Sequence, residues 1–292
     1  IFSLINQSVK YQSYSGSMCD NECGGGRFGL FSLCVNPESN EQVEDRLRNN
    51  ADRSKSQYTV GYVHQEKGNL DEAIRCYTEA IRHDDTNVDA IYNLGSAFQE
   101  KGDLQEAAKR FIRTIKLDPN HALAHYNLGY IYHEQGNLDE AIKYFQIAAE
   151  LNPRDTDTWI NLGIVFRDAG SVDEACRAYL RATALDPGCV MAYYNLGNTL
   201  YDVNRVGEAI KYYRQAVQLD PNHADAVFNL GIAYQDHNKP QDALKCYEAA
   251  LRLEPQFLEA EQAAAVLRQK LEEEEGQPRS GDLAPLRLDD NL

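Results

Sequence analysis

The stretch "AHYNLGYIYHEQGNLDEAIKYF", Ala124–Phe145, recurs with altered spelling along the 292-residue chain, and its interval is fixed at 34 residues. A glycine column marks the interval: Gly61, Gly95, Gly129, Gly163, Gly197 and Gly231. An alanine column and an aromatic column keep the same step: Ala73, Ala107, Ala141, Ala175, Ala209 and Ala243, then Tyr77, Phe111, Phe145, Tyr179, Tyr213 and Tyr247. Six units therefore fill residues 54–257 without an insertion, as 54–87, 88–121, 122–155, 156–189, 190–223 and 224–257. A fixed period of this length indicates a repeat architecture.

Each unit carries the pattern of two helices. In the third unit, His125, Leu128, Gly129 and Tyr132 fall at helical spacing. A residue that tolerates the left-handed conformation then ends the first helix of every unit: Gly68, Gly102, Gly136, Gly170, Asn204 and Asn238. Capping-box pairs predict the start of the second helix in four units: Asn69 with Glu72, Asp103 with Glu106, Asn137 with Glu140, and Ser171 with Glu174. Because one helix pair buries too little apolar surface alone, neighbouring pairs must stack.

These columns resemble the tetratricopeptide repeat (TPR) over about 70% of the chain. Prolines also match in register, closing five of the six units: Pro119, Pro153, Pro187, Pro221 and Pro255. The chain departs from the family pattern at Thr114, where the family prefers alanine, and at Asp85, where it prefers proline. The resemblance implies an all-α fold, a right-handed superhelical α-solenoid of six 34-residue helical hairpins.

The two ends lie outside the repeat. We expect residues 258–275 to form a helix that caps the last unit, because a solenoid must cover its terminal core face, and residues 276–292 to be a flexible tail. Residues 1–53 read as a partly disordered N-terminal extension in which 38–50 could form a short helix. Residues 1–18 are serine-rich and lack acids, which leaves two alternatives, an ordinary tail and an organelle-import sequence.

Charge and cysteine content restrict the partners and the compartment. The net charge of −16 disfavours nucleic acid and anionic membrane surfaces, and it favours a neutral to basic protein partner. No apolar run is long enough to cross a bilayer. The 7 cysteines are too sparse for a disulfide scaffold and indicate a reduced intracellular compartment, the cytoplasm first.

Three motifs formally suggest chemistry, and each is better explained without it. The GGGRFG stretch, 24–29, satisfies a dinucleotide fingerprint but lacks the preceding buried strand and the following helix that the fingerprint needs. Cys19, Cys23 and Cys34 supply only three zinc ligands. His121 and His125 are four residues apart, but the first follows Pro119 in a loop and the second fills a packing column. We therefore predict no enzyme, no cofactor and no metal.

One side of the first helices is the candidate binding surface. If each first helix is numbered from the start of its unit, positions 2, 5, 6, 9, 12 and 13 share a side. The resemblance implies that this side lines a concave groove for ligand peptides. Position 5 holds Tyr58, Tyr92, Tyr126, Ile160, Tyr194 and Phe228; position 6, after Thr59, holds Asn93, Asn127, Asn161, Asn195 and Asn229; position 13 is always acidic.

We take these aromatics and asparagines as partner-binding candidates, Ile160 and Thr59 excepted. Amides can bond a peptide backbone, aromatic rings offer contact area, and the acids favour Lys or Arg on the ligand. The alternative is that both columns serve only to join neighbouring units.

The function predicted is a non-catalytic protein-interaction scaffold, or a structural subunit of a larger complex, that holds an extended or helical polypeptide segment. A clamp for C-terminal carboxylates is excluded, because position 5 lacks lysine and position 2 carries acids. The asparagine column is similar to that of O-linked N-acetylglucosamine transferases, so the alternative is the substrate-recognition arm of such an enzyme.

Overall fold

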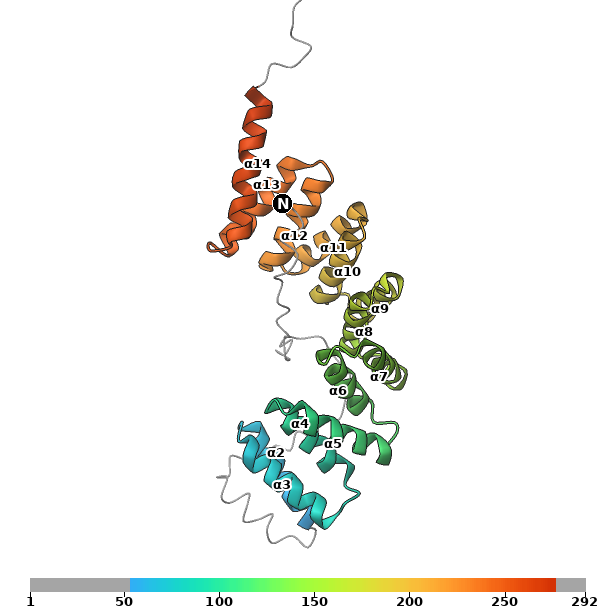
Figure 1. Cartoon of the computed structure of the whole chain (residues 1–292). Coiled ribbons are helices and arrows are strands. Elements are labelled where there is room, and N and C mark those ends of the chain that lie inside the picture. Colours follow the sequence, from blue (N-terminus) through green and yellow to red (C-terminus); the bar gives the residue numbers. More distant parts are fainter. Residues whose placement is uncertain (1–52, 277–292) are drawn as a thin grey trace, which may run out of the picture. The chain divides into compact units, whose positions relative to one another are not determined.

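The computed structural model describes residues 53–276, and within them it contains thirteen α-helices and no strand (Figure 1). The helices are α2 (Arg53–Glu66), α3 (Leu70–His83), α4 (Val88–Glu100), α5 (Leu104–Leu117), α6 (Ala122–Glu134), α7 (Leu138–Leu151), α8 (Thr156–Asp168), α9 (Val172–Leu185), α10 (Val190–Asp202), α11 (Val206–Leu219), α12 (Ala224–Asp236), α13 (Pro240–Leu253) and α14 (Leu258–Gly276). The short helix considered at 38–50, the 24–29 glycine stretch and Cys19, Cys23 and Cys34 lie outside these residues.

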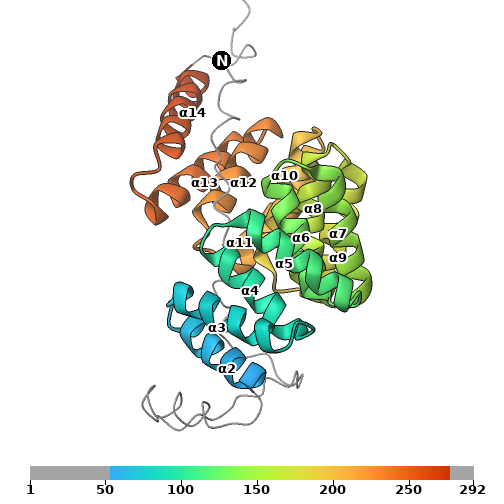
Figure 2. The ribbon, with the colours of Figure 1, turned by 60° about the horizontal axis from the view of Figure 1, so that its bottom comes forward.

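The helices pair as hairpins, and the hairpins stack in chain order. α2 packs on α3, α4 on α5, and so on to α12 on α13, while the second helix of each unit packs on the first helix of the next. First helices of neighbouring units also touch, as α6 touches α8 and α8 touches α10. Figures 1 and 2 show the same succession of hairpins from two directions. The predicted all-α solenoid of six hairpins is confirmed.

The turn inside each hairpin has the predicted left-handed residue. The φ angles are +74° at Gly68, +87° at Gly102 and +75° at Gly136 and Gly170, while Asn204 and Asn238 have 61° and 55°. Glycine pays no steric cost in this region, and asparagine pays less than other side chains. The residue after the turn donates its N–H back to the first helix, as Asn69 does to the carbonyl of His64 at 2.9 Å.

The four predicted capping-box residues are the N-caps of their helices, but in three of the four units the side-chain bond of a capping box is absent. Only the Asp103 carboxylate caps its helix, accepting from the N–H of Glu106 at 3.1 Å; Asn69, Asn137 and Ser171 make no side-chain cap. The glutamate half of the box forms in none of the four units, because the N–H of each N-cap residue is already bonded across the left-handed turn; the glutamates instead bond cations three residues on, as Glu72 does with Arg75.

The glycine column lies directly against the aromatic column of the same hairpin. A Cβ added at Gly163 would lie 2.6 Å from the Tyr179 ring, and one added at Gly129 would lie 3.0 Å from the Phe145 ring. Each ring also reaches the next unit, since Phe145 shares a cluster with Leu162 and Val165. The ring therefore joins its own two helices and the following hairpin.

α14 covers the apolar face of the last hairpin. Ala264 and Leu267 are buried against Ala243 and Tyr247 of α13, whereas Val266 on the other side is 69% exposed. This is the one-sided burial that a terminal solenoid helix needs. No helix of residues 53–276 combines the length and the apolar character that crossing a bilayer requires.

Candidate partner-binding face

Positions 2, 5, 6, 9, 12 and 13 of α2, α4, α6, α8, α10 and α12 are here called the first-helix face. On it the asparagine and tyrosine columns bond to each other across unit boundaries. The asparagine Nδ2 donates to the tyrosine Oη of the preceding unit in four pairs: Asn93 to Tyr58, Asn127 to Tyr92 and Asn229 to Tyr194 at 3.1 Å each, and Asn161 to Tyr126 at 2.9 Å. The structure thus gives both columns an inter-unit role, through side chains rather than backbone.

The position-5 rings are held from behind by the core. Tyr126 meets Phe145 edge-on with centroids 5.5 Å apart, and Tyr92 lies 5.6 Å from Phe111 and 4.6 Å from His121. Burial raises the pKa of the Tyr92 and Tyr126 hydroxyls, so both stay protonated at neutral pH. Partial burial leaves one edge of each ring on the surface.

The ladder is interrupted between the fourth and fifth units, where Ile160 replaces the tyrosine. Asn195 is only 2% exposed, and its Nδ2 has no hydrogen-bond partner among the described residues. Its backbone carbonyl accepts from Thr199 Oγ1 at 2.8 Å, a bond that does not involve the side chain. A buried amide without a partner costs free energy.

The other asparagines keep an acceptor for a ligand. Asn93, Asn127, Asn161 and Asn229 use Nδ2 in the ladder, and within residues 53–276 their Oδ1 atoms accept no hydrogen bond. All four are partly exposed. An amide oxygen has two acceptor sites, so a row of side-chain acceptors remains along the face.

A second ladder, which the sequence interpretation missed, joins position 12 to position 13 of the next unit at alternate boundaries. His133 Nε2 lies 2.8 Å from an Asp168 oxygen, Tyr201 Oη donates to Asp236 at 2.5 Å, and Gln65 donates to Glu100. Burial opposes ionisation of Asp168, but its bonds to His133 and Arg167 outweigh burial and lower its pKa. The shared separation of 35 residues in both ladders was the signal available in the sequence.

The acidic charge of this face has few cations to balance it. The outer sides of the second helices neutralise themselves through pairs three residues apart, such as Glu106 with Lys109 at 2.6 Å and Glu174 with Arg177 at 2.8 Å. On the first-helix face, by contrast, burial raises the pKa of Asp157 and Asp202. The first-helix face therefore carries carboxylates, such as Asp157 and Asp202, that form no ion pair with another described residue.

The residue before most first helices is a cap that the sequence interpretation also missed. The side chains of Asn87, His121, Asp155 and His223 accept from the N–H three residues on. His121 is thereby a helix cap, and His125 Nε2 bonds the Pro119 carbonyl at 3.0 Å. Within the described part of the chain, no group of His, Cys, Asp or Glu has the arrangement of a metal site.

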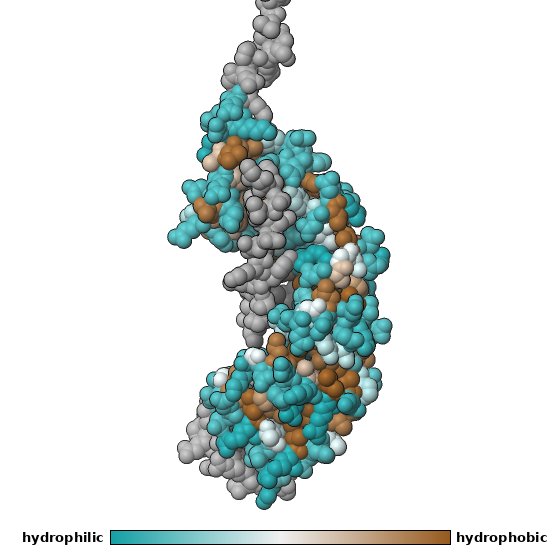
Figure 3. Space-filling model, viewed as in Figure 1, coloured by the Kyte–Doolittle hydropathy of each residue, from teal (hydrophilic) through white to brown (hydrophobic). Residues whose placement is uncertain are grey.

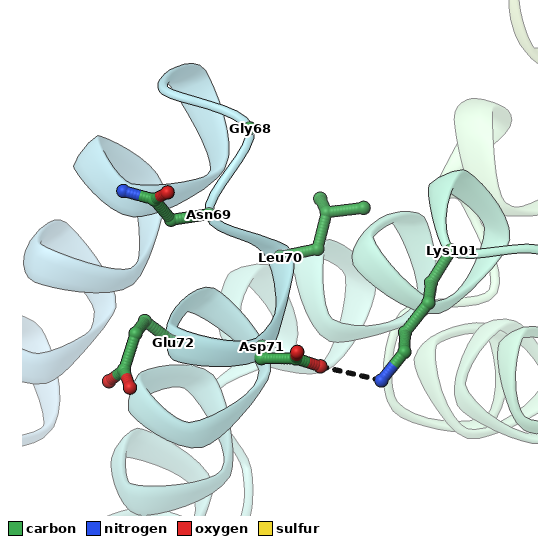
Figure 4. A pocket seen from close by; sticks show the side chains of 6 residues that line it. All are labelled: Gly68, Asn69, Leu70, Asp71, Glu72 and Lys101. Atoms are coloured by element: carbon green, nitrogen blue, oxygen red, sulfur yellow. Dashed lines mark hydrogen bonds and ion pairs between the residues drawn. The ribbon is translucent and has the colours of Figure 1, made fainter.

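A pocket of about 400 Å³ opens at the turn of the first hairpin, away from the first-helix face (Figure 4). Gly68, Asn69, Leu70, Asp71, Glu72 and Lys101 line it. Lys101 Nζ reaches Asp71 at 2.5 Å and links the first two units there, with both side chains at least half exposed. An exposed pair of this kind contributes little stability, and the pocket offers no convergent set of polar groups.

Removing one ladder bond is expected to destabilise the protein slightly. Asn127→Ala deletes the bond to Tyr92 and leaves a half-buried hydroxyl without its partner, which costs about 1 kcal/mol. Asn195→Ala, at the interrupted boundary, should be neutral or stabilising because it removes an unsatisfied amide. Urea unfolding followed by circular dichroism compares the two, and equal losses would contradict the role assigned to the ladder.

Completing the ladder is expected to have the opposite sign. Ile160→Tyr supplies the hydroxyl that Asn195 lacks, in the position where Tyr126 and Tyr194 already fit in neighbouring units. We expect a gain of about 0.5–1.5 kcal/mol, the net value of one hydrogen bond. Ile160→Phe is the matched control, since it adds the ring without the hydroxyl.

Comparison with known proteins agrees with this architecture. Sequence models of the tetratricopeptide repeat match residues 92–156 and 160–224 and again residues 224–257, and a TPR repeat model matches residues 61–102. No curated protein sequence matches the chain.

Solved structures share the fold. YrrB, described as a TPR protein with an unusual peptide-binding site, is 24% identical with a TM-score of 0.57, over 64% of this chain and 96% of its own. MamA is 29% identical with a TM-score of 0.54, over 57% and 97%. PilF of Pseudomonas aeruginosa is 19% identical with a TM-score of 0.61, over 78% and 99%. Six in-register hairpins, repeat models that together span nearly all of them, and TPR neighbours in structure place this chain in the tetratricopeptide repeat family.

Proposed function

We propose that this protein is an interaction scaffold that holds a partner polypeptide against its first-helix face. The observation that carries the proposal is the row of amide acceptors left along that face once the inter-unit ladder is made. A repeated acceptor suits a repeated donor, and the backbone N–H groups of a polypeptide supply one at every residue except proline.

Charge and exposure support the same face. The position-13 carboxylates line it in every unit, while the second helices pair their charges internally. Apolar side chains stand exposed beside the acids, Leu123 at 54% and Met191 at 43%. An acidic and partly apolar surface attracts cationic segments and gains from covering its apolar groups. YrrB, which has this fold, is itself a peptide-binding TPR protein.

Site-specific photo-cross-linking tests which face is used. Met191→p-benzoylphenylalanine places the probe on the first-helix face, and Leu180→p-benzoylphenylalanine places it on the second helix of the adjacent unit. The two original side chains are matched in exposure, at 43% and 44%. We expect one discrete cross-linked partner band from Met191, at least fivefold stronger than from Leu180, after irradiation in native extract.

Adding the captured partner in unlabelled form should reduce the cross-linked band from Met191, because it competes for the same face. Equal cross-linking from both positions, or a band from Leu180 alone, would refute the assignment of the first-helix face.

A further inference from the structure

Position 2 of the first helices holds Lys55 in the first unit and then alternates between acidic and apolar side chains. From the second unit to the sixth it reads Asp89, Leu123, Asp157, Met191 and Asp225. All five side chains belong to exposed residues. Exposed large apolar side chains are costly to leave in water, and here they recur at every second unit between carboxylates.

The ladders convert this sequence pattern into a spatial row. The ladders join residues 35 apart and so set the same register between first helices at every boundary except that between the fourth and fifth units, where α8 and α10 touch without a ladder bond. Packed helices lie about 8–10 Å apart. We take this interaxial distance as the interval between equivalent residues of successive units, which then follow one another as acid, apolar, acid, apolar, acid. Figure 3 shows hydrophobic areas set among hydrophilic ones over the visible part of the stack.

The acids of this row have no cation of their own. Asp89, Asp157 and Asp225 form no ion pair with another described residue. Asp157 is exposed as a residue, but its carboxyl group is partly desolvated, and this raises its pKa; the neighbouring carboxylates of Asp155 and Asp186 raise it further. A cation bound beside Asp157 would relieve this repulsion, so the row favours a positive group there.

The spacing of the row selects the conformation of the ligand. A polyproline II segment has three residues per turn and a rise of about 3.1 Å, so every third side chain returns to one face after about 9 Å. A β-strand sends third neighbours to opposite faces. An α-helix returns after seven residues, about 10.5 Å, but its interior N–H groups are already bonded. Only the polyproline II segment both matches the row and leaves N–H groups for the asparagine Oδ1 atoms.

We propose that the first-helix face binds a polyproline II segment in which a Lys or Arg side chain and a large apolar side chain alternate at every third residue. The cations lie against Asp89, Asp157 and Asp225, and the apolar side chains lie against Leu123 and Met191. This inference rests on the proposed function and specifies the chemistry of its partner.

Two peptides of identical composition test the alternation. KAPLAPKAPLAPK places lysine and leucine alternately at every third residue, and the pattern reads the same in both chain directions. KAPKAPKAPLAPL keeps the length, charge, proline content and three-residue period but groups the lysines. With the full chain, fluorescence anisotropy at low ionic strength should give at least tenfold tighter binding of the alternating peptide. Equal affinities, or no measurable binding of the alternating peptide, would overturn the proposal.

Charge reversal at the centre of the row tests whether the central lysine of the peptide lies against Asp157. Asp157→Lys should weaken the alternating peptide at least tenfold, and replacing the central lysine of the peptide by glutamate should restore binding to this variant. Asp139→Lys, on the exposed start of α7, is the matched control. It makes the same charge change away from the row, where salt screens the interaction with the peptide, so binding should stay within about twofold. If Asp157→Lys weakened binding and the glutamate peptide did not restore it, the placement of the lysine against Asp157 would be overturned.

Two further results separate this proposal from the function on which it rests. A helical peptide with the same five side chains at every seventh residue should bind more weakly; tighter binding would reject the polyproline II conformation. If the partner cross-linked through Met191 bound Asp157→Lys as well as the unchanged chain, the scaffold function would stand and the alternating row would be rejected.

Discussion

Phe145→Ala is expected to lower the free energy of unfolding by about 3–5 kcal/mol, the usual cost of emptying a buried phenylalanine site. The ring is 1% exposed and lies between three neighbours: Gly129 of its own hairpin, the Tyr126 ring, and Leu162 of the next unit. Its loss opens a cavity at the centre of the stack, where both adjacent hairpins are held in place.

The form of the unfolding transition should change as well. Each unit of a solenoid contacts only its neighbours, so the first two units are coupled to the last three only through the third unit. When the third unit is weakened, the two groups can unfold separately. Urea titration by circular dichroism should then show a broadened or two-step transition in place of one. Tyr62→Ala, at a side chain 46% exposed, is the control and should cost under about 0.5 kcal/mol. An unchanged midpoint for Phe145→Ala would contradict the packing described here.

Gly163→Ala is expected to destabilise the protein by about 1–3 kcal/mol, although alanine is the better helix former. The added methyl would lie 2.6 Å from Tyr179 Cε1, and Tyr179 is fully buried with no room to move aside. The two helices must separate or the ring must leave its rotamer, and both disturb the adjoining unit.

Gly207→Ala is the matched control, because it makes the same chemical change in a helix without the contact. The nearest atom to the new Cβ would be His237 Cε1 at 3.6 Å, an ordinary van der Waals distance. We expect a gain of about 0.4–1 kcal/mol from reduced chain entropy in the unfolded state. Thermal melts of the two variants should therefore move in opposite directions. A gain at both positions would show that backbone propensity, rather than ring contact, governs the glycine column.

The glycine and asparagine turns illustrate what local sequence could decide. Gly68, Gly102, Asn204 and Asn238 occur at one point of every repeat, and only residues that accept positive φ fit there. This is a property of a few consecutive residues, so the helix ends were predictable. The capping boxes show the complementary limit: Asn69 and Asp103 are N-caps as predicted, but the N–H of each is taken by a carbonyl across the turn, so the glutamates three residues on have no N–H to bond there.

The placement of the tyrosine and asparagine columns on one side of the first helices was predictable, but their bonding was not. Helical periodicity was enough to place Tyr92 and Asn127 on one side of their helices. It could not reveal that Asn127 Nδ2 reaches Tyr92 Oη at 3.1 Å, because that depends on how one hairpin is set against the next. The same dependence hid the isolated amide of Asn195, a consequence of Ile160 in the preceding unit.

By itself the sequence determined the period, the number of hairpins, the left-handed turns and the side of the first helices that faces away from the core, because each follows from spacing within a single repeat. Tertiary structure decided which atoms of that side remain for a ligand. The asparagine donors are used between units while their oxygens stay available, and the register of stacked helices, which no single unit contains, sets that division.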